Sequence, residues 1–209
     1  DNFTIGTRLS FSQQNSNLDN IGQDGGVLAR ATRLGPNFPA FDDQGRFAQR
    51  ASDIDAIELS TPNILAEIKS QNRRLQQDRL LGNFYAEWEV IPGLKVRSTF
   101  AANYRIDNNE FFNRRVDMFN WERGDMTLSW NENRRLEKTY YEAVNLTSWL
   151  QATYEKSFGL NNFNILVGAN QESFREEFFG AARIELPTNN LPVLDFGNAG
   201  TATNYGGAS

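Results

Sequence analysis

The chain has 209 residues, a net charge of −5 and a mean hydropathy of −0.57, and its sequence contains neither cysteine nor histidine. These absences exclude a disulfide framework, thiol catalysis, a Ser-His-Asp triad and nearly every transition-metal site, and no cofactor is expected. Lys and Arg form no basic stripe, so no nucleic-acid partner is expected either. No apolar run reaches about 18 residues, which excludes a transmembrane helix. A transmembrane β-barrel is compatible with this composition, because only alternate residues of its strands face lipid.

The first predicted strand covers residues 2–13, where apolar and polar residues alternate. Residues 14–72 lose this alternation and are rich in Gly, Asn, Asp, Gln and Pro, which predicts a long loop. Within it, Thr61-Pro62 has the pattern of an N-cap followed by a first-turn proline, and apolar residues at helical spacing follow as far as Ile68. The segment predicts one or two helical turns or, the interpretation that we favour, a loop anchor that buries a few side chains.

Four longer strands follow as two predicted hairpins, in which apolar and polar residues alternate along each arm. Very short turns at Pro92-Gly93 and Gly159-Leu160 join the arms of each hairpin. The arms are several-fold longer than a typical globular strand. The predicted strands cover residues 73–91 and 94–107 in the first hairpin, and 135–158 and 161–183 in the second.

Short and long connections alternate along the chain. The short ones are the two hairpin turns, and the long ones are predicted over residues 14–72, 108–134 and 184–209. Bacterial outer-membrane barrels have this alternation, with the short turns on the periplasmic side. A soluble sandwich would show turn signals every 8 to 12 residues or so. The predicted fold is therefore all-β: about five antiparallel, up-and-down strands of a large transmembrane β-barrel, with long extracellular loops and short periplasmic turns.

The alternation also assigns a direction to each side chain. We expect the apolar positions to face outer-membrane lipid and the polar positions to face the barrel lumen. The expected lipid-facing residues are Phe84, Trp88, Val96, Phe100, Leu146, Leu150, Ile165 and Val167. The expected lumen-facing residues are Glu87, Glu89, Arg97, Arg105 and Glu155.

Few residues suggest chemistry. Glu87 and Glu89 share one strand face, as a glycosidase pair would, but solvated lining residues are the expected role, so no catalytic residue is assigned. The run from Asp107 to Glu110 offers oxygen ligands without the spacing and glycine of a calcium loop, so a plain turn is expected there rather than a metal site. Aromatic residues of the 108–134 loop are candidates to stack on sugar rings, to contact a partner protein or to form a local core. They are Phe111, Phe112, Trp121 and Trp130.

Particular segments of the hairpins carry a resemblance to a known family. They are the Leu-Gly-Asn opening at 81–83, the Pro-Gly-Leu turn at 92–94, the stretch from Tyr154 to Phe158, Leu166-Val167-Gly168, and TPNILAEI at 61–68. In these features the chain resembles the SusC/RagA group of TonB-dependent outer-membrane transporters of Bacteroidetes. The resemblance spans nearly all of the chain and is one of strand and turn pattern.

The resemblance implies a barrel of about 22 strands around an N-terminal plug. It implies an importer of oligosaccharides or peptides in the outer membrane of a Gram-negative bacterium of the Bacteroidetes type. Its implied partners are a SusD-like surface lipoprotein, outer-membrane lipid, and TonB through the plug region. Because the sequence starts at Asp1 without a signal pattern and ends in loop-like residues, we expect an internal piece of the barrel. The alternative is a soluble or cell-surface β-rich carbohydrate-binding module.

Overall fold

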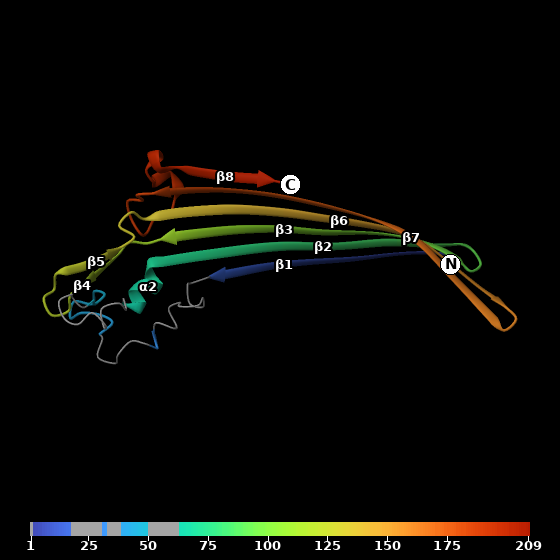
Figure 1. The fold of residues 1–209 in the computed structure, drawn as a ribbon, viewed down its shortest axis with the longest axis horizontal. Coiled ribbons are helices and arrows are strands. Elements are labelled where there is room, and N and C mark those ends of the chain that lie inside the picture. Colours follow the sequence, from blue (N-terminus) through green and yellow to red (C-terminus); the bar gives the residue numbers. More distant parts are fainter. Residues whose placement is uncertain (1, 18–30, 33–38, 50–62) are drawn as a thin grey trace.

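The main feature of the molecule is a long, gently curved sheet of six antiparallel strands (Figure 1). The structure is a computed structural model and describes residues 2–17, 31–32, 39–49 and 63–209. The strand order is β1-β2-β3-β6-β7-β8, so each strand pairs with its neighbour along the sheet in up-and-down fashion. The strands are β1 (Phe3–Asn17), β2 (Gln71–Ile91), β3 (Leu94–Asn113), β6 (Arg135–Phe158), β7 (Asn161–Ile184) and β8 (Thr203–Ala208). The prediction of an all-β, antiparallel fold is confirmed.

Two tight turns join the arms of the hairpins, and in the first hairpin the register shifts once, between Glu89 and Ile91. Gly93 has φ of +88°, a left-handed conformation that glycine adopts without a steric penalty, and it allows β2 to reverse directly into β3. Gly159 does the same between β6 and β7 with φ of +58°. β1 and β8 are the two edges of the sheet, so it is not closed into a barrel by the residues that the structure describes.

The structure corrects the predicted loops at several places. β3 continues to Asn113, past the predicted end at 107, and Glu110 on this extension forms an ion pair with Lys138 of β6 at 2.9 Å. Residues 114–134 are not an irregular loop, because β4 (Val116–Phe119) and β5 (Met126–Trp130) form a second, two-stranded sheet. Within 184–209, two short 3-10 helices, η1 (Leu194–Phe196) and η2 (Ala199–Thr201), precede β8.

A short helix, α2 (Ile64–Ser70), leads into β2. Its N-cap is Asn63, whose side-chain oxygen accepts a hydrogen bond from the backbone N–H of Ala66 at 3.1 Å. Thr61 and Pro62, where the sequence predicted the start, lie outside the described residues. The helix also anchors its segment, because Ala66 is completely buried.

The two clusters of buried side chains lie at the end of the sheet that carries α2, β4 and β5. One cluster consists of Ala66, Val116 and Met118, with Phe47 and Trp130 packed against it. The other consists of Phe112, Leu136 and Leu186, with Leu194 against it. The rest of the sheet, in the part of the chain that the structure describes, is a single layer with both faces uncovered (Figure 1). The helices in the part of the chain that the structure describes include no candidate membrane span.

Candidate functional site

The central part of the sheet has one apolar face. Residues that pair directly in an antiparallel sheet point to the same side, so the register identifies the members of each face. Trp88 pairs with Val96, and Val96 in turn pairs with Ala152 of β6. The same rule brings together all the residues that the sequence placed toward lipid: Phe84, Trp88, Val96, Phe100, Leu146, Leu150, Ile165 and Val167. We name this face the apolar belt.

The belt is uncovered and has the height of a membrane core. Leu150 is 55% exposed and Val167 is 67% exposed, which is unusual for aliphatic side chains in the middle of long strands. Along β3 the belt extends from Leu94 to Tyr104, a distance of about 33 Å at about 3.3 Å per residue. A strand tilt of about 40° reduces this to about 25 Å, which matches the apolar band of outer-membrane barrels.

Strand β1 widens the belt with residues that the sequence prediction had not assigned. Phe3 pairs with Trp88 and Leu9 pairs with Gly82, so the apolar side chains of β1 continue the same face. They are Phe3, Ile5, Leu9 and Phe11, all more than half exposed. The alternation of apolar and polar residues in residues 2–13 is the sequence pattern from which these four lipid-facing positions could have been predicted.

Polar groups border the belt on the side of the loops. Beyond Tyr104, the next residues of the same parity are Ile106 on β3 and its partner Glu142 on β6. The Tyr140 hydroxyl donates a hydrogen bond to Glu142 Oε2 at 2.7 Å. This hydrogen bond is the main reason that the pKa of Tyr140 is raised to about 12. At the opposite border, the rings of Phe158 and Phe163 lie edge to face with centroids 5.8 Å apart.

The opposite face is polar, and its side chains are linked across strands. Glu87 pairs directly with Arg97, and Arg97 Nη1 lies 3.7 Å from Glu87 Oε2. The Arg97 guanidinium also lies over the Tyr85 ring at 4.1 Å. Farther along, Arg105 Nε donates to Asp107 Oδ1 at 2.9 Å. The residues predicted toward the lumen all lie on this face: Glu87, Glu89, Arg97, Arg105 and Glu155.

The carboxylates considered for chemistry are already engaged. Glu87 faces Arg97, and Glu89 accepts a hydrogen bond from the backbone N–H of Gly93 at 3.1 Å. The run from Asp107 to Glu110 is not the turn that the sequence predicted, because it lies within β3 and its carboxylates alternate between faces. No group of three or more Asp, Glu, His or Cys residues is placed to hold a metal ion in the part of the chain that the structure describes.

The four loop aromatics do not form one platform. Phe111 and Phe112 are consecutive in β3 and point to opposite faces. Phe112 is 1% exposed and packs in a core cluster, which is the local-core alternative among the three that the sequence left open. Trp130 packs against the other cluster, and Trp121 lies in the turn between β4 and β5. Phe112 and Trp130 pack locally, because burial of a large aromatic ring removes much apolar surface from water.

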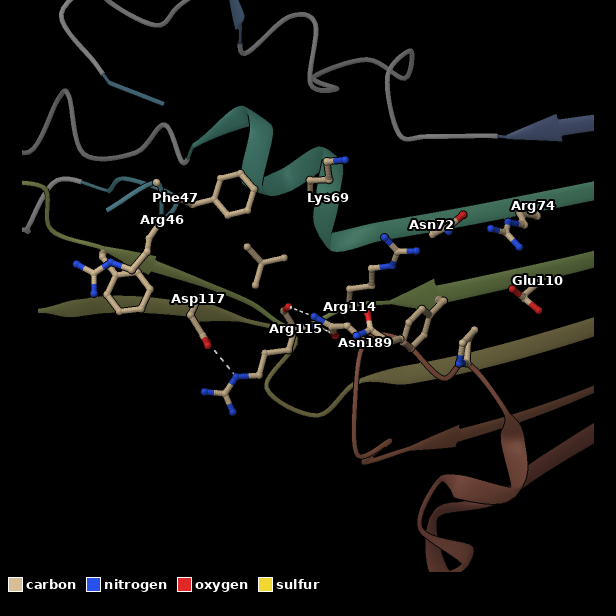
Figure 2. Close-up of a pocket in the computed structure, with 16 residues that line it drawn as sticks. Arg46, Phe47, Lys69, Asn72, Arg74, Glu110, Arg114, Arg115, Asp117 and Asn189 are labelled. Carbon is tan, nitrogen blue, oxygen red and sulfur yellow. Dashed lines mark hydrogen bonds and ion pairs between the residues drawn. The ribbon is translucent and has the colours of Figure 1, made fainter. Parts of the chain in front are cut away.

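A hollow of about 840 Å³ lies among α2, the ends of β2 and β3, and the segment after β7 (Figure 2). Two asparagines hold its walls together. The Asn131 amide donates to the backbone oxygens of Ser70 and Arg114, and Asn189 both accepts from and donates to the backbone of Arg115. Sequence reasoning missed this hollow, because its basic residues come from segments far apart in the chain. They are Arg46, Lys69, Arg74, Arg114 and Arg115.

These features define a class of protein. A single-layer antiparallel sheet, apolar and exposed on one face and polar on the other, is the architecture of a transmembrane β-barrel wall. The comparisons with known proteins agree with this class. No protein-family model matches the chain. It is similar to TonB-dependent receptor P3 of Formosa agariphila, with 23% identity over 167 residues, which is 80% of this chain and 15% of the relative.

Three solved structures have the same fold over nearly the whole chain. The structure of the RagAB peptide transporter matches with a TM-score of 0.72 and 13% identity, covering 100% of this chain and 23% of that one. The RagAB peptide importer in its open-open state gives 0.70 and 16%, covering 99% and 22%. Its closed-closed state gives 0.69 and 15%, covering 99% and 23%.

The resemblance indicated by the sequence is therefore confirmed. The chain is similar to a TonB-dependent receptor and has the fold of part of a barrel of the SusC/RagA type. The comparisons support the barrel over the soluble binding module, and these relatives are a receptor and transporters rather than enzymes. The chain spans 15% of the curated relative and under a quarter of each RagAB chain that it matches.

Proposed function

We propose that these residues form part of the wall of a TonB-dependent importer in the outer membrane of a Gram-negative bacterium of the Bacteroidetes type. The observation that carries the proposal is the exposed apolar belt, whose height of about 25 Å fits a bilayer core. Neighbouring strands pair antiparallel over most of their length, and such pairing satisfies the backbone groups that a lipid environment leaves without water. The similarity to TonB-dependent receptor P3 and to the RagAB structures supports the same role.

In this role the two faces do different work. The apolar belt, including Phe84, Trp88 and Leu150, contacts lipid chains. The opposite face, with its linked groups such as Arg97 and Glu87, lines the lumen and meets water or a plug. The wall performs no covalent chemistry, and transport draws its energy from TonB acting on the plug region.

The partner and the substrate belong to the same proposal. A SusD-like surface lipoprotein contacts the loop end of the sheet, where α2, β4 and β5 are gathered (Figure 1). The substrate is an oligosaccharide or a peptide. The RagAB neighbours are named as peptide transporters and importers, and this supports the peptide. Of the aromatic candidates, Phe111 and Trp121 remain for substrate contact, because Phe112 and Trp130 pack in the core clusters.

Nitroxide spin labels on neighbouring residues test the facing. The 209 residues contain no cysteine, so a single cysteine at Phe100 or Thr99 gives one label site in this segment. In the full chain in bilayers, we expect dissolved oxygen to relax the label at 100 far more than a water-soluble nickel chelate does. The label at 99, on the polar face, serves as the control and should lack this preference. An oxygen preference at 99 equal to that at 100 refutes the assignment.

A further inference from the structure

The hollow of about 840 Å³ opens over the sheet face that carries the apolar belt. Arg74 pairs with Glu110 and Asn72 pairs with Phe112, and these rows continue the parity of Leu80 and Tyr104 at the border of the belt. All four of these row residues line the hollow. The hollow therefore lies on the outer side of the wall, above the belt, rather than on the polar face that lines the lumen.

Its charge is unbalanced. Five basic and two acidic residues line it. Arg115 is held by Asp117 at 2.9 Å, and Arg46 by Asp42 at 2.7 Å. Glu110, the other acidic residue, is held by Lys138, which lies outside the lining. Three lining cations are left without an ion-pair partner among the described residues: Lys69, Arg74 and Arg114.

These three cations are gathered at one place. They also line a second, adjoining hollow of about 200 Å³, together with Asn17 and Asn72. Figure 2 shows the Arg114 side chain extending toward Asn72, with Lys69 and Arg74 on either side. Arg114 Nε is buried without a hydrogen-bond partner in the described structure. An unsatisfied guanidinium donor beside two more cations is relieved by an anion with several acceptor oxygens.

The structural reason for this gathering is the joint between α2 and the end of β3. The backbone N–H of Arg114 donates to Ser70 O, the last residue of α2, at 2.7 Å. This contact places Arg114 beside Lys69, one residue earlier in α2, and beside the first residues of β2. This backbone hydrogen bond joins the end of β3 to α2, so the three cations lie close together although like charges repel.

The height of the cations fits a membrane surface. Arg74 lies six residues from Leu80 along β2, about 20 Å at about 3.3 Å per residue, or about 15 Å above the belt at the same tilt. This level lies beyond the hydrocarbon and among head groups. Because the hollow lies on the outer side of the wall, its ligand is not a substrate that passes through the lumen. Because the hollow lies above the apolar belt, its ligand is not an acyl chain.

We propose that Lys69, Arg74 and Arg114 form a site for phosphate groups of glycolipids in the outer leaflet around the barrel. This inference rests on the proposed function, because it requires the apolar belt to face lipid. The chemistry recognised is a multiply charged phosphate, for which an arginine fork and an ammonium are the preferred donors. The lipid head group delivers it to the outer side of the wall, where the hollow opens.

Binding of lipid A to the full chain in uncharged detergent micelles tests the site. Arg74→Gln, Lys69→Gln and Arg114→Gln should each weaken binding about fivefold, since a basic residue near a charged lipid surface contributes on that scale. The matched control is Arg135→Gln. Arg135 pairs with Asn113, the residue before Arg114, and lies on the polar face, so its loss removes one positive charge near the height of Arg114 and should leave binding unchanged.

Two further probes identify the source of the phosphate. Dephosphorylated lipid A should bind at least tenfold more weakly than lipid A, and inorganic phosphate should compete only at far higher concentration. Equal losses for Arg135→Gln and Arg74→Gln would mean general charge attraction and overturn the site. Inorganic phosphate binding as tightly as lipid A would overturn the lipid as the source.

The outcome is separable from that of the proposed function. Arg74→Gln should reach the outer membrane at the level of the unmodified chain, because Arg74 lies outside the belt. If the labels at 99 and 100 show the expected facing while all three variants bind lipid A normally, the wall stands and the phosphate site is refuted. If the labels fail, the function falls and the site loses its basis.

Discussion

An arginine placed in the middle of the apolar belt should destabilise the inserted protein severely. Leu150 pairs with Ser98, four residues from Leu94 at the border, which places it about 10 Å deep in a belt of about 25 Å. At such a depth on the lipid face, an arginine costs about 2 to 4 kcal/mol. Leu150→Arg should therefore reduce the folding equilibrium constant by roughly two orders of magnitude.

Reversible folding of the full chain into lipid vesicles, followed across a urea series, measures this loss. Gln151→Arg is the first control, because Gln151 lies next in β6 on the polar face and should change stability by less than about 1 kcal/mol. Ile165→Arg is the second. Ile165 pairs with Tyr154 at the border of the belt, where an arginine costs only about 0 to 1 kcal/mol. Equal losses for Leu150→Arg and Gln151→Arg, or no dependence on depth, would refute the membrane-facing interpretation.

Three other predictions concern the turns, the border and the loop core. Gly93→Ala should destabilise folding by about 1 to 3 kcal/mol, because Gly93 has a positive φ and an added Cβ would collide with Glu155 O. Gly159→Ala should cost only about 1 kcal/mol in the same urea series, because Gly159 has a positive φ but open space around it. Because the folded pKa of Tyr140 is about 12, above the ordinary value of 10, its contribution to stability is full below pH 10 and is lost as pH rises through 12. In Tyr140→Phe, the decrease of the urea unfolding midpoint between pH 10 and pH 12 should be smaller than in the unmodified chain. The same decrease in both proteins would contradict a role of Tyr140 in this pH dependence. Phe112→Ala should cost about 3 to 5 kcal/mol in the loop core and expose residues 184–196 to protease, whereas Phe111→Ala should not.

The strands of the wall and their faces can be predicted from the sequence, because they depend on the alternation of neighbouring residues. Period-two alternation identifies the apolar face of each arm, so it places Phe84 and Phe100 on apolar faces. A register shift between Glu89 and Ile91 then makes Phe84 and Phe100 direct partners. The extension of β3 was missed because residues 108–113 have no apolar alternation. Their strand is held by the backbone ladder and by polar pairs such as Glu110 with Lys138.

The packing at the loop end of the sheet cannot be predicted in the same way, because its contacts join segments that are distant in the sequence. The sequence left Phe112 open between ligand contact, partner contact and a local core, and only the packing of Leu136 and Leu186 against it identifies the core. The phosphate site draws Lys69 and Arg114 together across the α2 and β3 joint, and no single stretch of the sequence contains them. Pairing of this kind depends on tertiary packing, which periodicity does not encode.

The direct pairing of β3 with β6 has a consequence for how such a protein changes over time. Asn113 and Arg135 are partners in the sheet, so residues 114–134 leave and rejoin the wall at adjacent positions. The turn between β4 and β5 can therefore be lengthened or shortened without shifting the register of any wall strand, whereas Val116 and Met118 are held in their core cluster. Sequence changes there can alter the surface at the loop end of the sheet, while the pairing of the long strands stays unchanged.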